Sequence, residues 1–255
     1  MTLYNKKFYA QQQSGSERSA MEVVPIIINF IQPKSVIDVG CGVGNWLSVF
    51  SKLGVKDFLG VDGNWVDRQL LKIPQNNFVS HDLTKPLNLN RKFDLVISLE
   101  VAEHLPERYA ETFVDSLINL GSVVLFSAAI PYQGGIPHVN EQFPDYWAEL
   151  FRKRNFVFID AIRPKIWYND KVEYWYCQNI VLYVNQKAID NYHRLMKEIK
   201  APQSYPLSIV HPRAYLEHTK AVGISNLPLR EIIGSLPVAT SRTIKRKALR
   251  IRKQQ

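Results

Sequence analysis

A glycine-rich segment directly after an apolar run constrains the fold of this chain more than any other feature. The segment is VIDVGCGVGNW, residues 36–46, and it places glycine at positions 40, 42 and 44. Glycines between a buried strand and a helix permit a tight turn and a close approach of the backbone to a ligand. The segment therefore predicts a ligand-binding turn at the carboxyl end of a strand in an α/β sheet.

Strand-like runs recur along the chain with helix-length segments between them, which is typical of a parallel sheet. Five such runs are expected at 35–40, 58–62, 77–82, 93–99 and 123–129. Two later runs, at 156–163 and 179–184, have no long helical pattern between them. We expect this later pair to be antiparallel and hairpin-like, at the edge of the sheet.

Helical and irregular segments flank the predicted core, which spans residues 35–185. Residues 1–34 are expected to form one or two helices over the mouth of the ligand site, with a helix in 22–31 interrupted early by Pro25. Residues 186–255 are expected to form an extension with a basic tail. It begins with an amphipathic helix in QKAIDNYHRLMKEIK (186–200) and continues with the proline-rich, irregular APQSYPLSIVHPRAYLEH (201–218).

Acidic residues at the ends of three successive strands indicate the kind of ligand. Asp38 lies two residues before the first glycine, Asp62 ends the second strand and Asp82 ends the third. A dinucleotide is disfavoured, because its pyrophosphate would meet the Asp38 carboxylate and its G-x-G-x-x-G pattern needs glycine where this chain has Asn45. A ligand with positive charge and no phosphate fits better, and S-adenosylmethionine is such a ligand. The alternative is that the three acids are helix N-caps.

The segments VIDVGCGVGNW, GVD, HDL and FDLVISLEVAEHL resemble, in order and spacing, the motifs of class I S-adenosylmethionine-dependent methyltransferases. The similarity spans about residues 35–184. It implies a Rossmann-like α/β fold, with a seven-stranded, mostly parallel sheet whose antiparallel last strand is inserted beside the fifth. It also implies that Asp38 and Gly40 lie near the methionine part, Asp62 on the ribose, and Asp82 and Leu83 near the adenine. The expected cofactor-binding residues are Asp38, Gly40, Gly42, Asp62, Asp82, Leu83 and Glu100.

Two carboxylates and an imidazole follow the fourth strand in EVAEH, residues 100–104. They would share one face of a helix that begins there, because positions i, i+3 and i+4 lie on one side. The string is similar to the ExxEH of two metal-dependent branches, the ubiquinone-pathway O-methyltransferases and the small-RNA 2′-O-methyltransferases. In those branches the two Glu and the His hold a divalent ion, and the RNA enzymes add a later histidine.

This resemblance implies a Mg²⁺ or Mn²⁺ site, with His138, in the loop after the fifth strand, as the later histidine. The implied metal ligands are Glu100, Glu103, His104 and His138. The candidate catalytic residues are His104, His138 and Glu141. The alternative is a site without metal, in which Glu100 caps near the cofactor and His104 hydrogen-bonds locally or serves as a base.

Charge and composition limit the partners of the chain. The formal net charge is +9, and the segment SRTIKRKALRIRKQQ (241–255) carries seven Lys or Arg and no acid. Such a segment could contact nucleic acid or an anionic membrane surface, and the alternative is a solvated terminus. The longest apolar run near the start, residues 23–31, is far shorter than the ~20 residues of a membrane span. With no secretion-signal pattern and two cysteines that make no disulfide framework, we expect a cytoplasmic protein without a membrane span.

These features favour an O-methyltransferase that acts on a sugar or another small hydroxylated metabolite. The metal stays open at this point: a divalent ion would lower the pKa of a coordinated hydroxyl, and the alternative is transfer without metal. An RNA 2′-O-methyltransferase is the alternative. EVAEH and the basic tail support it, and the lack of a recognisable RNA-binding module in the sequence opposes it. A non-catalytic scaffold is a third hypothesis, which the intact glycine loop and the three acids oppose. The sequence makes no prediction of oligomeric state.

Overall fold

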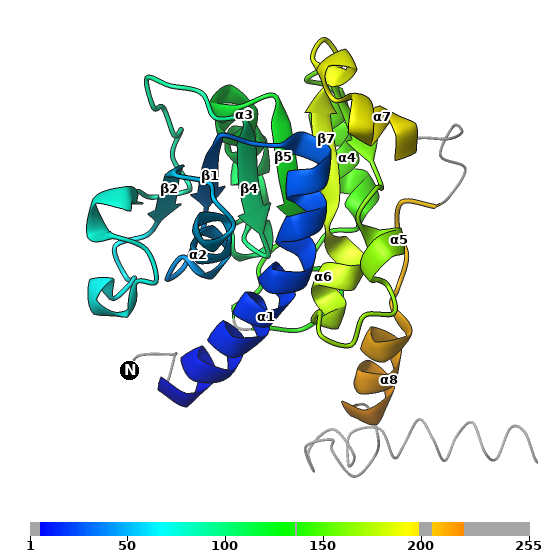
Figure 1. Ribbon diagram of the computed structural model, residues 1–255. Coiled ribbons are helices and arrows are strands. Elements are labelled where there is room, and N and C mark those ends of the chain that lie inside the picture. Colours follow the sequence, from blue (N-terminus) through cyan, green and yellow to red (C-terminus); the bar gives the residue numbers. More distant parts are fainter. Residues whose placement is uncertain (1–5, 136, 199–205, 222–255) are drawn as a thin grey trace, which may run out of the picture. The chain divides into compact units, whose positions relative to one another are not determined.

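A computed structural model describes residues 6–135, 137–198 and 206–221, and its centre is a sheet (Figure 1). In that part of the chain the sheet has seven strands in the order β3-β2-β1-β4-β5-β7-β6. The strands are β1 Ser35–Val39, β2 Asp57–Asp62, β3 Phe78–Ser80, β4 Leu95–Leu99, β5 Val123–Ser127, β6 Phe156–Ile159 and β7 Val181–Asn185. β1 to β5 are parallel, and β7 is antiparallel to both β5 and β6. The predicted α/β class with an antiparallel last strand beside the fifth is confirmed.

The order of the strands reverses between β1 and β4, and such a switch point opens a crevice at the carboxyl ends of the strands. The helices are α1 Lys6–Ile31, α2 Asn45–Lys52, α3 Ala110–Leu120, α4 Pro144–Arg152, α5 Arg163–Ile166, α6 Tyr174–Asn179, α7 His193–Glu198 and α8 Pro212–Ala221. Single 3-10 turns are η1 Arg68–Leu70, η2 Gln75–Asn77, η3 Ala102–His104, η4 Glu107–Tyr109 and η5 Ile189–Asn191. The chain forms two compact units, Met1–His211 and Pro212–Gln255, and α8 is the described part of the second.

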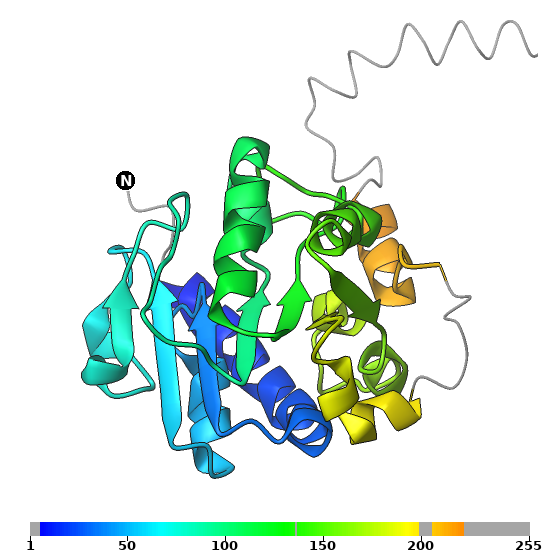
Figure 2. The same cartoon turned by 90° about the horizontal axis from the view of Figure 1, so that it is seen from above.

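Alternation along the strands gives each face of the sheet its own apolar layer. Val36, Leu95 and Leu125 belong to the layer that also contains the buried sides of α1 and α2. Their neighbours Ile37, Val96 and Val124 belong to the layer under α3 and α4. Figure 2 shows the two pairs of helices on opposite sides of the strands. The carboxyl edge of β1 and β4 lies between these layers, so both layers support it.

The N-terminal helix differs from the prediction at Pro25. This residue lies inside α1, which continues to Ile31, so the expected interruption is wrong. Val23, Val24 and Ile27 are fully buried around the proline. Proline cannot donate the backbone hydrogen bond of an ordinary helical residue, and the packing of these three side chains compensates for its loss. α1 passes next to both α2 and α6 (Figure 1).

Two other segments also depart from the expectation. The antiparallel pairing of β6 with β7 is confirmed, but the connection contains α5 and α6 and is not a hairpin turn. The helix expected over 186–200 is reduced, among the described residues, to η5 and α7. The expected irregular stretch is wrong from residue 212 on, where α8 begins with a proline in its first turn, a position that needs no N–H donor. No helix in the described ranges has the length and apolar character needed to cross a bilayer.

Candidate active site

The glycine loop leaves the end of β1 in a conformation that suits glycine. Gly40, Gly42 and Gly44 have φ of +87°, +54° and +84°, in the left-handed region that side chains disfavour. A Cβ on Gly40 would overlap the Val101 side chain, and one on Gly44 would lie 2.9 Å from the side chain of Ile73. A Cβ on Gly42 would have no atom of the described chain within 4 Å. The loop therefore packs tightly at its two ends and is open in the middle, where a ligand has room.

Two buried carboxylates lie beside this loop. Asp62 accepts hydrogen bonds from the backbone N–H groups of Gly42, at 2.7 Å, and Gly63, at 2.6 Å. Burial raises the pKa of Asp62 against the effect of these two donors. Burial and the neighbouring Asp62 raise the pKa of Asp38 well above its ordinary value. Because burial is unfavourable for each acid as an anion, a cationic ligand next to them would stabilise both, and a sulfonium with an ammonium fits this demand.

The third acid is in a different environment. Asp82 is exposed, and its Oδ1 accepts hydrogen bonds from the backbone N–H of Thr84, at 3.0 Å, and from its hydroxyl, at 2.7 Å. These bonds lower the pKa of Asp82. The carboxylate therefore stabilises a local turn and not the start of a helix, while the adjacent Leu83 is buried. A contact of Asp82 or Leu83 with adenine stays a prediction.

Glu100 does not share a helical face with Glu103 and His104, which corrects the prediction for EVAEH. Glu100 has φ of +55° and lies before η3, and α3 begins only at Ala110. Its backbone N–H is held by Ser127, whose carbonyl and hydroxyl oxygens both lie at 3.0 Å. This bifurcated contact draws the chain out of β4 into the left-handed conformation, which a continuous helix from residue 100 does not allow.

Amide side chains hold the carboxylate of Glu100. Gln133 donates to Oε2 at 2.7 Å, and Asn179 donates to Oε1 at 3.1 Å. The side-chain amides of Asn179 and Gln178 also donate to Oε1 of Gln133, at 2.8 and 3.3 Å. Sequence reasoning assigned no role to Gln133, Gln178 or Asn179, and the only signal for them is the position of amides next to apolar runs. The network fixes the orientation of Glu100 at the crevice.

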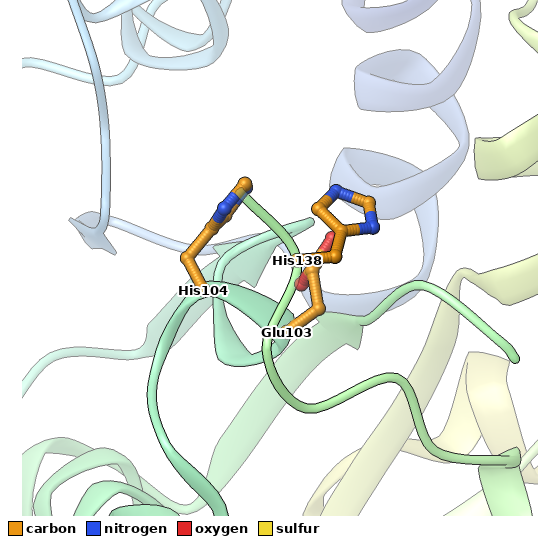
Figure 3. Close-up of side chains that lie close together, drawn as sticks. All are labelled: Glu103, His104 and His138. Atoms are coloured by element: carbon orange, nitrogen blue, oxygen red, sulfur yellow. The ribbon is translucent and has the colours of Figure 1, made fainter. Parts of the chain in front are cut away.

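Glu103, His104 and His138 form a compact group, to which η3 contributes the first two and the loop after β5 the third (Figure 3). One possible ligand atom from each residue lies within 4.8 Å of the others. The Glu103 side chain is fully buried, and neither of its carboxylate oxygens accepts a well-aligned hydrogen bond from the described residues. Burial and the nearby Glu100 raise the pKa of Glu103 well above its ordinary value, against the smaller effect of the backbone N–H groups of Glu103 and Ala129. A buried carboxylate with such weak hydrogen bonding indicates that a cation or a proton belongs beside it.

The two imidazoles are oriented by oxygen atoms. Nδ1 of His138 lies 2.8 Å from Glu141 Oε1, and Nδ1 of His104 lies 2.9 Å from the carbonyl oxygen of Pro137. Since these oxygens only accept, each Nδ1 carries the hydrogen and Nε2 keeps its lone pair. Burial lowers the pKa of His104, which favours the neutral ring that a metal needs.

Hydrogen bonds to Glu141 and to Glu103 hold the loop that carries His138. Glu141 accepts from the backbone N–H groups of Tyr132, at 2.7 Å, and Gly134, at 3.1 Å. The backbone carbonyl of Glu103 accepts from the N–H groups of Val139, at 2.9 Å, and Asn140, at 3.0 Å. A carboxylate and two imidazoles with free Nε2 atoms are a donor set that fits a divalent ion. The structure brings Glu103, His104 and His138 together and leaves Glu100 outside this group.

Known proteins provide an independent comparison. Residues 21–163 match the family described as "Methyltransferase domain". Among solved structures, a similar fold occurs in CalS10 with bound S-adenosylmethionine, an amino pentose methyltransferase from Micromonospora echinaspora. The identity is 12%, the TM-score is 0.53, and the match covers 72% of this chain and 99% of that one.

Two further structures have the same degree of likeness. DesVI from Streptomyces venezuelae is 13% identical with a TM-score of 0.50, over 70% of this chain and 95% of that one. The methyltransferase domain of the bacterial protein CtHen1-C is 18% identical with a TM-score of 0.50, over 66% and 98% of the two chains. At these identities the likeness shows the fold alone. No curated protein matches the sequence.

Proposed function

We propose an acceptor for this chain, which belongs to the methyltransferase domain family and is a class I S-adenosylmethionine-dependent methyltransferase. The proposed acceptor is a hydroxyl group of a sugar or another small metabolite. We further propose that a divalent ion assists the transfer. The observation that carries the proposal is the fully buried Glu103 carboxylate, which accepts no well-aligned hydrogen bond from the described residues and has two oriented imidazoles beside it.

The cofactor is held, in this proposal, by the glycine loop and the two buried acids. The backbone at Gly40 and Gly42 approaches the methionine part, and Asp62 accepts from the ribose hydroxyls. Asp38 and Glu100 face the positive groups of the ligand. The raised pKa values of Asp38, Asp62 and Glu100 support this assignment, because buried carboxylates favour a cationic ligand over a neutral one.

The metal site has three protein ligands in this proposal: Glu103, His104 and His138. Glu100 is left out because it lies outside the compact group that these three residues form. Three protein ligands leave positions open for the acceptor, as in catalytic rather than structural metal sites. A divalent ion there would lower the pKa of a bound hydroxyl. Glu141 orients His138, and the carbonyl oxygen of Pro137 orients His104. Without a metal, the free Nε2 of His104 would instead be placed to take the hydroxyl proton.

The same chemistry would serve an RNA 2′-hydroxyl, so acceptor and metal are tested together. Protein freed of metal by chelation would be incubated with labelled S-adenosylmethionine and either a set of nucleotide sugars and free sugars or a short RNA. Added Mn²⁺ or Mg²⁺ should restore methylation of a sugar, and an RNA ending in 2′-deoxyribose should behave like one ending in ribose. Methylation that requires the RNA 2′-hydroxyl would replace the sugar proposal with the RNA alternative. Full activity after chelation would remove the metal from the proposal.

A further inference from the structure

Residues 206–211 are an irregular segment at the end of the first compact unit of the chain. Side chains of two helices of that unit hold it. Arg163, on α5, donates to the carbonyl oxygen of Leu207 at 2.9 Å, and the Ser208 hydroxyl donates to Asp145 on α4. Figure 1 shows the segment passing beside α5. A stretch without helix or strand is therefore fixed by contacts with residues far away in the sequence.

The last residue of this segment, His211, reaches the interior of the unit. His211 is 5% exposed, and Gln178 on α6 is fully buried. The backbone N–H of His211 donates to Oε1 of Gln178 at 2.8 Å. A backbone N–H can only donate, so the oxygen of the Gln178 amide faces His211 and its NH2 group faces the other way.

The amides around Glu100 receive their orientation from Gln178. Nε2 of Gln178 donates to Oδ1 of Asn179 at 3.0 Å and to Oε1 of Gln133 at 3.3 Å. These bonds leave the NH2 groups of Asn179 and Gln133 facing the Glu100 carboxylate, to which they donate at 3.1 and 2.7 Å. Hydrogen bonds therefore connect the His211 N–H, at one end of the network, with Glu100 at the other.

A reversed network, with all three amides turned over, is the arrangement that these two ends exclude. In it the oxygens of Asn179 and Gln133 would face the Glu100 carboxylate. Glu100 opposes this arrangement, because its oxygens repel other acceptors. The His211 N–H also opposes it, because it would meet the NH2 group of Gln178. Both ends are satisfied only in the observed arrangement, and the segment therefore helps to fix the position of Glu100.

We propose that Gln178 is a positioning residue of the active site, through which residues 206–211 hold Glu100 in place. Gln178 is fully buried and acts through Glu100, not on a ligand. The inference rests on the proposed function, in which Glu100 faces the positive groups of S-adenosylmethionine. It adds to the site two parts of the chain that lie beyond the residues 21–163 matched by the methyltransferase domain family.

A purely structural role for Gln178 is the competing explanation, because a buried amide with satisfied hydrogen bonds also stabilises the fold. That role predicts that a Gln178 variant loses stability but binds the cofactor normally once it is folded. The positioning role predicts a loss of affinity that depends on the charge of the ligand and on the presence of Glu100.

The experiment is isothermal titration calorimetry with two ligands. One is S-adenosylmethionine, and the other is 5′-methylthioadenosine, which keeps the adenosine and the sulfur but carries no charge. Gln178→Met keeps the size of the side chain and removes the amide. This variant should bind S-adenosylmethionine about five- to tenfold more weakly, because hydrogen bonds that hold a charged group are weakened. Its affinity for 5′-methylthioadenosine should not change.

Glu100→Gln and the double variant decide whether Gln178 acts through Glu100. Gln178→Met should cause no further loss in a protein that already carries Glu100→Gln, because the group that it positions is gone. Losses that add up in the double variant, equal losses for both ligands, or no loss in Gln178→Met would each overturn the inference. No loss in Glu100→Gln would instead remove Glu100 from the cofactor site of the proposed function, and the inference with it.

Two further variants serve as a second test and a control. Gln178→Asn keeps an amide but is one methylene too short to bridge His211 and Asn179, so it should show the same ligand-dependent loss. Ser208→Ala removes a contact of the same segment with Asp145 that does not involve Gln178, and it should leave both affinities unchanged. An equal loss in Ser208→Ala would overturn the role of Gln178. A melting curve for each variant verifies that it is folded.

Discussion

Glu141 Oε1 lies 2.8 Å from Nδ1 of His138, and this contact decides which nitrogen of the imidazole is available to a ligand. The same carboxylate also accepts hydrogen bonds from the backbone N–H groups of Tyr132 and Gly134, and these bonds hold it in place beside the ring. A carboxylate behind a histidine both fixes the tautomer and increases the basicity of the other nitrogen. Glu141 is therefore a positioning residue in the proposed metal site rather than a group that reacts with the acceptor.

The first prediction concerns this pair. Glu141→Gln keeps the size of the side chain but removes its charge, so Mn²⁺ affinity should fall about 10- to 100-fold, as for other residues behind a metal ligand. Affinity for S-adenosylmethionine should not change. Titration calorimetry on chelator-treated protein measures both. Glu149→Gln is the matched control, since Glu149 pairs with Arg152 on the surface of α4. Unchanged Mn²⁺ affinity in Glu141→Gln would contradict the role of Glu141.

The fold could be predicted because its signals are local in sequence. Each apolar run and the glycine loop specify a strand or a turn within a few residues, and the order of the elements then favours one sheet. Boundaries at the carboxyl ends were less accurate, as at 156–163, where the strand ends at Ile159 and a helix begins at Arg163. Proline after Arg163 permits that early helix start, because the first turn needs no donor there.

The site could be predicted only in part, because much of it depends on contacts between distant residues. Gln133 and Asn179 reach Glu100 from 33 and 79 positions away. No periodic pattern in the sequence indicates either contact. Ser127, on the neighbouring strand, turns Glu100 out of the helix that the spacing of EVAEH indicates. Tertiary hydrogen bonds of this kind outweigh local helix propensity, which is a weak preference.

The second prediction is a dependence of stability on pH through Asp38. Its pKa in the folded protein is raised, so the stability that its protonated form contributes is complete below the unfolded value of ~3.9 and is lost as the pH rises through the raised pKa. Asp38→Asn removes that loss. Without cofactor, this variant should exceed the unmodified protein in stability by ~1–3 kcal/mol near neutral pH, the cost of a buried, poorly compensated polar group, which is several degrees in Tm.

Thermal melting from about pH 4 to pH 8 measures this effect. The difference in Tm should be smallest at the acidic end and should grow with pH. Saturating S-adenosylmethionine should reverse it, since only the unmodified protein keeps the carboxylate that the cation needs. A constant difference across the pH range would show that Asp38 is not the titrating group.

The third prediction concerns the basic run, which lies outside the described residues. Deleting residues 242–255 removes seven positive charges. If the acceptor is a small molecule, methylation should proceed at the same rate without the run. If the acceptor is RNA, the shortened protein should bind RNA more weakly, and the slope of log affinity against log salt concentration should be shallower by ~0.7 for each lost phosphate contact with a single strand. Filter binding at several salt concentrations gives the slope, and equal slopes would exclude the run as a nucleic-acid contact.

The last prediction compares two glycines that both have positive φ but differ in what lies around them. Gly42 in the loop after β1 and Gly54 after α2 have φ of +54° and +104°, and no described atom lies within 4 Å of a Cβ placed on either. Substitution of Gly42 by alanine therefore costs about 1–2 kcal/mol of stability through backbone strain, without overlap. Gly54→Ala should cost at least as much, because its φ lies outside the left-handed helical region. Only Gly42 donates its N–H to Asp62, and only its open space lies in the proposed cofactor site. Gly42→Ala should weaken S-adenosylmethionine binding at least tenfold, and Gly42→Val should abolish it, while Gly54→Ala should bind as the unmodified protein does. Calorimetry measures the loss of binding, and denaturant unfolding of the same preparations measures the loss of stability. Equal binding by Gly42→Val and Gly54→Ala at similar stability would mean that the cofactor does not approach the middle of the loop.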